Sequence, residues 1–288
     1  MDNNLRRYAV TAFGHNCSPE ELVRTLPRAA ALGYTHLEVR VQETPLEAFW
    51  TPEYCREVSA ACSRYQVSLS FHASQRINLS DPSPRFAAPS HQLAGASLEA
   101  AAGVGARWVN FHLGMGYDRD TPTHRRQALE CALPALTTLV EMGGRLGVAV
   151  TIENLFRLPR ADLYYLGERR EDFSYLLGNC PGLGFCYDSG HANLEPSPLA
   201  WVEEFAPFLV SAHLHDNDGH SDRHLPPGDG NGSVDWPGLL AALGRANYRG
   251  PFILEGVERT WIEGKTYLVG LLDPVRCAAA GSVSGRLE

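Results

Sequence analysis

The chain has 288 residues, of which 44% are hydrophobic and 20% charged, and its formal net charge is −8. This composition is typical of a globular protein with a sizeable core, and it excludes disorder away from the ends. The acidic balance argues against a nucleic-acid backbone as partner, although bound cations would reverse the local sign. The seven cysteines are scattered, which predicts reduced thiols in a cytoplasmic protein. The sequence shows no apolar leader and no run of about 20 apolar residues, so we expect no membrane partner.

Strand and helix signals alternate along the chain. The first strand is expected at residues 8–13, ending in Gly14-His15-Asn16, and the first helix is expected to begin at Ser18 and Pro19 and to end at Gly33. Further strands are expected at residues 35–40, 67–72, 107–112, 147–153, 183–188, 209–215 and 251–255. Further helices are expected at residues 51–65, 87–103, from Thr121 with a break or kink near Pro134 and a stop at Gly143-Gly144, at 170–179, from Pro198 and at 236–246.

Eight strand signals that alternate with helices, without a glycine-rich phosphate loop, predict a closed parallel (β/α)8 TIM barrel. One domain is expected over residues 1–288, with a core from about residue 8 to 277. The tail after Cys277 is small and polar and is expected to fray. An open, doubly wound sheet is the alternative architecture.

Ionisable residues recur at or near the carboxyl ends of the expected strands. They are His72, His112, Glu153, Asp188, His213 and Glu255. Any one of them taken singly is as well explained by capping a helix or satisfying a loop amide, but in a barrel these strand ends converge on one face. Three carboxylates brought together there would repel one another unless a cation compensates them. We therefore expect a divalent metal ion at this face.

The densest polar stretch runs from Ser211 to Gly230 and holds four imidazoles, four carboxylates and a guanidinium. It follows an apolar strand signal and ends at a Pro-Gly stop, so a site is the better interpretation than a solvated loop. Imidazole and carboxylate together favour a borderline divalent ion such as zinc, manganese or cobalt.

Several segments between residues 8 and 255 carry a family pattern. They are Phe71-His-Ala with Ile77-Asn-Leu, Asn110-Phe-His-Leu-Gly, Thr151-Ile-Glu-Asn, Cys186-Tyr-Asp-Ser-Gly-His, His213-Leu-His-Asp-Asn, Asp222-Arg-His-Leu-Pro-Pro-Gly-Asp-Gly and Ile253-Leu-Glu-Gly. In these segments the chain resembles the xylose isomerase-like barrels, a superfamily that includes ketose 3-epimerases, hydroxypyruvate isomerase, inosose dehydratase and endonuclease IV.

The resemblance to the isomerase and epimerase branch implies one divalent ion, often manganese, held by Glu153, Asp188, His213 and Glu255. Zinc, cobalt and magnesium are the other candidate ions. This branch also implies substrate contacts by His191 and Arg223, and we expect His72 and His112 to join them. The endonuclease IV branch instead implies up to three zinc ions, held by residues matching His72, His112, Glu153, Asp188, His191, His213, Asp222, His224 and Glu255.

Two departures weaken the endonuclease interpretation. His72 is followed by Ala73-Ser74-Gln75, without an aromatic residue to insert into DNA, and the last strand ends in Glu255-Gly256-Val257, where the endonuclease pattern has Glu-Thr-Pro. The sequence His224-Leu-Pro-Pro-Gly-Asp-Gly is more similar to the sugar-isomerase branch.

The leading hypothesis is therefore a metal-dependent isomerase or epimerase of a small keto-sugar or polyol, acting through a metal-stabilised enediolate, with Glu153 and Glu255 as proton carriers. The alternatives are a zinc phosphodiesterase acting on nucleic acid, a lyase similar to inosose dehydratase, and a sugar-binding barrel without catalysis. The aromatic-rich loop at residues 156–165 is either a homo-oligomer interface or an active-site lid, and residue types do not decide between them.

Overall fold

The computed structural model describes residues 13–41, 49–119, 121–160 and 162–272. Eight parallel strands in this part of the chain form a closed barrel, and β10 pairs with β1 to complete it. In the order in which they pair, the strands are β1 (Phe13–Cys17), β2 (His36–Arg40), β3 (Ser68–His72), β4 (Trp108–Phe111), β6 (Ala149–Glu153), β8 (Gly184–Asp188), β9 (Leu209–Leu214) and β10 (Phe252–Leu254). The closure confirms the predicted TIM barrel and excludes the open sheet.

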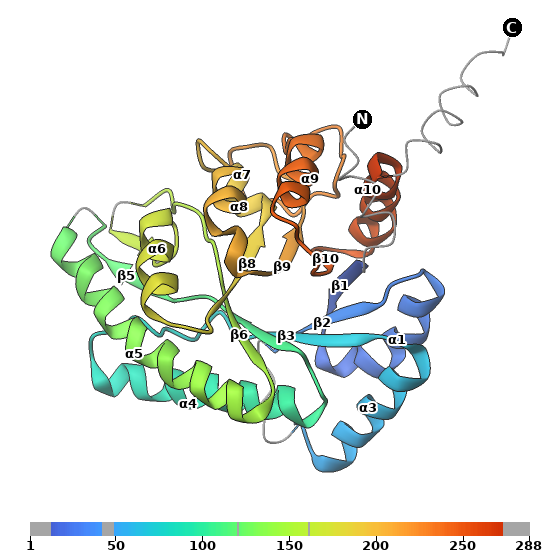
Figure 1. Cartoon of the computed structure of the whole chain (residues 1–288), viewed down its shortest axis with the longest axis horizontal. Helices are drawn as coiled ribbons and strands as arrows, with labels where there is room; N and C mark the ends of the chain where they lie inside the picture. The colour runs from blue at the N-terminus through green and yellow to red at the C-terminus, as the bar shows by residue number, and fades with distance from the viewer. Residues whose placement is uncertain (1–12, 42–48, 120, 161, 273–288) are drawn as a thin grey trace, which may run out of the picture.

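Helices surround the strands, as Figure 1 shows. In chain order they are η2 (Pro19–Glu21), α1 (Leu22–Ala31), α3 (Pro52–Tyr65), α4 (Pro84–Gly103), α5 (Pro122–Leu146), α6 (Arg170–Asn179), α7 (Ser189–Asn193), α8 (Ala200–Phe205), η3 (Ala206–Phe208), α9 (Trp236–Arg245), the π-helix η4 (Thr260–Gly264) and α10 (Lys265–Leu272). Helix α3 illustrates how local sequence sets these bounds. The Thr51 side chain accepts a hydrogen bond from the Tyr54 amide at its start, and Gln66 adopts a left-handed conformation at its end.

The first strand extends beyond its predicted end. Gly14, His15 and Asn16 were expected to end it, yet they pair with β2 within the strand. Polar residues near the carboxyl end of a barrel strand face the site and do not mark a stop. Gly14 also leaves room for the His36 ring, because an added Cβ would lie 3.1 Å from that ring. Residues 8–12 of the predicted strand lie outside the described residues.

Helix α5 is continuous, so a break near Pro134 and the predicted stop at Gly143-Gly144 are wrong, while a kink at Pro134 stays a prediction. Ala132 and Leu136 are buried on either side of Pro134, and we attribute the continuity to this packing, which offsets the proline's cost of about 3 kcal/mol. Gly143 permits a close approach to the following strand, because its Cβ would lie 2.4 Å from the Val148 carbonyl oxygen. The helix ends at Gly147, whose φ of 73° is left-handed.

The site face carries elements that the periodicity did not predict. Helix α7 follows β8 directly, and β5 (Met115–Tyr117) pairs with β7 (Leu163–Tyr165) as a small antiparallel sheet apart from the barrel. The six cysteines in the described ranges are free thiols. No helix within those ranges has the length and apolar character needed to cross a membrane. The predicted fraying of the tail after Cys277 falls on residues outside the described part.

Candidate functional site

The strand ends bring the predicted site residues together. Glu153 ends β6 and Asp188 ends β8, His213 lies in β9, and Glu255 follows β10. The register pairs Asp188 with His213 directly, so their side chains face the same way. All four side chains are buried, so an ionised group among them is costly unless an opposite charge or a hydrogen bond compensates it.

Glu153 lies at the centre of the cluster. Four imidazole nitrogens lie 3.2–3.6 Å from its carboxylate oxygens, those of His72, His112, His191 and His213. The Asn110 amide also donates a hydrogen bond to Oε2. Burial alone would raise the Glu153 pKa, but the surrounding imidazoles, with His213 the largest contributor, hold the pKa well below its usual value. Glu153 is therefore a carboxylate at neutral pH.

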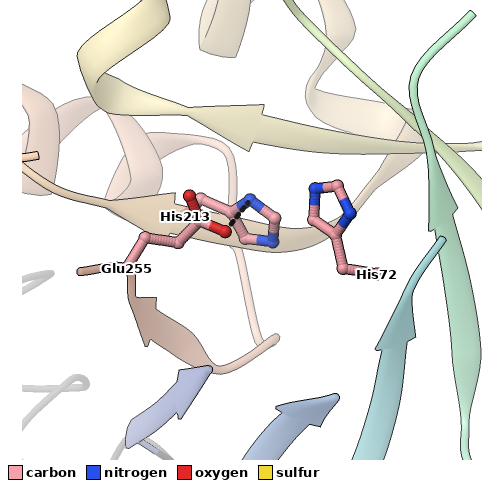
Figure 2. Close-up of side chains that lie close together, drawn as sticks. All are labelled: His72, His213 and Glu255. Atoms are coloured by element: carbon pink, nitrogen blue, oxygen red, sulfur yellow. Dashed lines mark ion pairs between the residues drawn. The ribbon is translucent and has the colours of Figure 1, made fainter. Parts of the chain in front are cut away.

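His213 presents one ring nitrogen to three carboxylates. Its Nδ1 lies 3.4 Å from Glu153, 3.6 Å from Glu255 and 3.9 Å from Asp188. Figure 2 shows the ion pair between His213 and Glu255 and the His72 ring on the far side of His213. The four residues predicted to hold the metal ion thus lie together, with the carboxylates of Glu153, Asp188 and Glu255 around His213 Nδ1.

A second group lies beside the first. The Asp222 carboxylate is 3.5 Å from His191 Nε2, 3.8 Å from His215 Nδ1 and 3.2 Å from His224 Nε2. The rings of His215 and His224 stack with centroids 3.9 Å apart. His215 also links the two groups, because its Nε2 lies 3.1 Å from Asp188. The nine residues of the endonuclease-type pattern are thus near one another.

The donor atoms fit divalent cations. Two sets of three donors with atoms within 4.8 Å of one another contain the predicted ligands His72, His213 and Glu255, and His72, His112 and Glu153. Among the described residues, His213 Nδ1 and His112 Nε2 are buried without a hydrogen-bond partner. Such orphaned nitrogens are costly unless a ligand satisfies them, and imidazole with carboxylate suits zinc, manganese or cobalt.

Neighbouring imidazoles in the cluster differ in charge. Burial would lower the pKa of His72, but its hydrogen bond to Glu153 and the nearby carboxylates raise it to about 9. Burial dominates at His112 and lowers its pKa below the usual value. At neutral pH the metal-free protein therefore holds His72 charged and His112 neutral, so cation binding at His72 must release a proton.

Arg223 is the one predicted residue that the described contacts do not bring into the cluster. Its guanidinium lies 3.3 Å from Asp218, and half of the side chain is exposed. Its predicted contact with substrate stays a prediction.

A cavity of about 370 Å³ adjoins the cluster. It is lined by His112, His191 and Asp222 of the cluster and by Phe156 and Tyr165. The Phe156 ring lies 5.1 Å from the His191 ring. This volume is within the range of small-molecule sites. Phe156 and Tyr165, from the loop whose role the sequence did not decide, thus border this cavity.

Besides Asn110, the sequence prediction omitted His215 and Glu38, which also touch the centre. His215, in the dense polar stretch, bonds to Asp188. Glu38 lies in the middle of β2, and its Oε1 is 2.6 Å from His213 Nε2. The available signal for Glu38 was its position between the apolar residues Leu37 and Val39, because a carboxylate buried inside a strand is seldom without a partner.

The family model of the xylose isomerase-like TIM barrel matches residues 26–271. The chain belongs to this family. It is 31% identical over 126 residues to the ketose 3-epimerase of Arthrobacter globiformis, a match that covers 42% of this chain and 39% of that enzyme. The chain thus matches less than half of that enzyme's length.

Two solved structures show the same fold. A D-tagatose 3-epimerase-like protein superimposes with a TM-score of 0.80 at 22% identity, covering 93% of this chain and all of that one. A Thermus thermophilus protein soaked with ZnCl2 superimposes with a TM-score of 0.70 at 24% identity, covering 91% of this chain and 98% of that one.

Proposed function

We propose that this protein is a divalent-metal-dependent isomerase or epimerase of a small keto-sugar or polyol. The observation that carries the proposal is His213 Nδ1, a buried nitrogen without a hydrogen-bond partner among the described residues, that faces the carboxylates of Glu153, Asp188 and Glu255. These four residues would hold the ion. When bound, it would supply Lewis acidity toward the carbonyl and neighbouring hydroxyl oxygens of the sugar.

Glu153 and Glu255 are the proton carriers in this proposal. Both carboxylates face the same His213 nitrogen, so both border the place where a reacting carbon would lie. One carboxylate takes the proton from the carbon beside the carbonyl, and the other returns a proton from its own side. Burial keeps water from competing for that proton.

The neighbouring imidazoles would orient the substrate. His112 and His191 line both the cluster and the cavity, so they can donate to or accept from sugar hydroxyls there. His72 completes this wall on the Glu153 side. Arg223 would reach substrate oxygens by turning away from Asp218. The family membership, the ketose 3-epimerase match and the tagatose epimerase-like fold support a sugar as the substrate.

Deuterium exchange tests the proposal. Metal-loaded protein incubated with a panel of ketoses and their epimers in heavy water should place deuterium at the carbon beside the carbonyl, because a carboxylate that carries the proton exchanges it with solvent. Glu153→Gln and Glu255→Gln should each abolish the exchange while the protein stays folded. Absence of exchange across the panel, in a preparation with bound metal, would contradict the proposal.

One observation favours a second candidate, a zinc phosphodiesterase of the endonuclease IV kind. Glu153 Oε2 lies 3.3–3.6 Å from nitrogens of His72, His112 and His213, so this carboxylate would be shared by the donors of more than one ion. A further donor set, His215 with Asp222 and His224, lies alongside. About three zinc ions per chain with metal-dependent nicking of an abasic-site duplex would establish this candidate, and one ion with exchange would exclude it. A lyase would be recognised by a dehydrated product in the exchange assay.

A further inference from the structure

Glu38 is a fully buried carboxylate in the interior of the barrel. It lies on β2, and its Oε1 contacts Nε2 of His213 on β9, which is separated from β2 around the barrel wall by β1 and β10. The contact is 2.6 Å long, the shortest of the distances from His213 to a carboxylate in the described part of the chain. It occupies the ring nitrogen opposite the one that faces Glu153, Asp188 and Glu255.

A chain of hydrogen bonds continues from Glu38 toward the other end of the barrel. Ser70 Oγ lies 2.8 Å from Glu38 Oε2, and His36 Nε2 lies 2.8 Å from Ser70 Oγ. His36 Nδ1 is 2.9 Å from the half-exposed Ser68 hydroxyl. The His36 ring is fixed by stacking on Trp108 at 4.8 Å with an interplanar angle of 4°.

The carboxylate of Glu38 determines which group donates in each of these hydrogen bonds. A carboxylate only accepts, so the Ser70 O–H must donate to Glu38 Oε2, and the 2.6 Å contact of Oε1 with His213 requires a hydrogen on His213 Nε2. The Ser70 oxygen then accepts from His36 Nε2–H, which leaves the His36 Nδ1 lone pair facing Ser68. The contact with Glu38 thus keeps a hydrogen on His213 Nε2 and leaves Nδ1 as the ring nitrogen that can bind a cation.

We infer that Glu38 is a positioning residue for the metal centre, fixing the tautomer and ring orientation in which His213 Nδ1 faces the incoming cation. The inference rests on the proposed function, because it assumes that His213 is a metal ligand. Carboxylates that hold the far nitrogen of a ligating histidine orient the ring and raise its basicity, and their loss costs about 10–100-fold in metal affinity. Ser70 and His36 hold Glu38 in turn.

Three variants test the inference with zinc alone as the probe. Glu38→Ala removes the acceptor, Glu38→Gln keeps its volume, and Ser68→Ala removes the far hydroxyl of the same chain as a matched control. The affinity of each purified protein for Zn²⁺ is measured by competition with a chelator, and folding is checked by circular dichroism. We expect affinity to fall about 100-fold for Glu38→Ala, about 10-fold for Glu38→Gln and less than about 2-fold for Ser68→Ala.

Histidine tautomers provide a readout that a merely space-filling role would leave unchanged. In Glu38→Gln the amide oxygen accepts from His213, so its NH2 group faces Ser70, which must then donate onward to His36 Nε2. We therefore expect the His36 ring hydrogen to move from Nε2 to Nδ1. Nitrogen chemical shifts of ring-labelled histidines in the zinc-loaded protein report this change.

The outcomes separate this inference from the proposed function. The role of Glu38 alone is overturned if the parent protein binds zinc, the folded Glu38→Gln and Glu38→Ala variants bind it with equal affinity, and the His36 tautomer is unchanged. Parent protein that binds no zinc, manganese or cobalt overturns the metal centre and the inference with it. If Glu38→Ala fails to fold, the affinity and the His36 tautomer of Glu38→Gln decide.

Discussion

Replacing Gly190 by alanine should damage the metal centre through its packing. A Cβ on this residue of α7 would lie 1.9 Å from Cε1 and 2.3 Å from Nδ1 of His215, where ordinary contacts begin at 3.4 Å. The ring or the helix must therefore move by about 1.5 Å, which breaks the 3.1 Å bond from His215 to Asp188. Overpacking of this kind costs about 1–3 kcal/mol, and each kcal/mol lowers the melting temperature of a protein near this size by about 2–4 °C.

Thermal unfolding of metal-free and zinc-loaded protein measures the effect of Gly190→Ala. We expect a lower Tm in both states, and a smaller rise in Tm on adding zinc, because Asp188, His191 and His215 form one of the donor sets. Gly178→Ala is the matched control. This residue lies near the end of α6 with no atom within 4 Å of an added Cβ, so alanine should stabilise the helix by up to about 1 kcal/mol. A Gly190→Ala protein with the parent Tm and zinc response would refute the packing argument.

Three further changes address the ligands, the substrate and the pH dependence. Glu153→Gln or Glu255→Gln should lose the bound ion while circular dichroism shows the parent fold, because each removes one compensating charge; equal metal by elemental analysis would remove that residue from the shell. Arg223→Ala should keep its metal and raise KM for the true substrate, and unchanged kinetics would remove Arg223 from the site. Burial holds the pKa of His15 at about 4, below its ordinary 6.5, so the unfolded chain binds more protons between these values and stability falls as pH drops through that window. Without this group, the His15→Phe protein should lose less unfolding free energy between pH 7 and pH 4.5, by up to roughly 3 kcal/mol, as measured by urea unfolding. An equal loss of stability in parent and variant would contradict the role given to His15.

The barrel, and the gathering of ionisable side chains at one of its ends, could be predicted because both depend on local sequence. Alternation of strand and helix signals fixes a parallel barrel, and the parallel direction alone brings strand ends such as Glu153 and Asp188 to one face. Two local rules failed where packing overrode them. Gly143 resembles a helix stop by composition, but its lack of a Cβ serves the approach to Val148, and that contact is visible only in three dimensions.

Glu38 shows why the support behind the ligands could not be predicted. Its contact with His213 joins strands that are not neighbours in the sheet, so it exists only because the sheet closes and side chains meet across the interior. Side chains alternate between the two faces along a strand, so the sequence places His36 and Glu38 on the same face of β2. It does not tell whether that face meets water, helices or a metal ligand. Once the sheet is known to close, the inward face of each strand should be searched for buried charged residues as well as the strand ends. A buried carboxylate must have a partner, because burying an unpaired charge is costly. In this barrel the partner of Glu38 is the ring of His213, a predicted metal ligand.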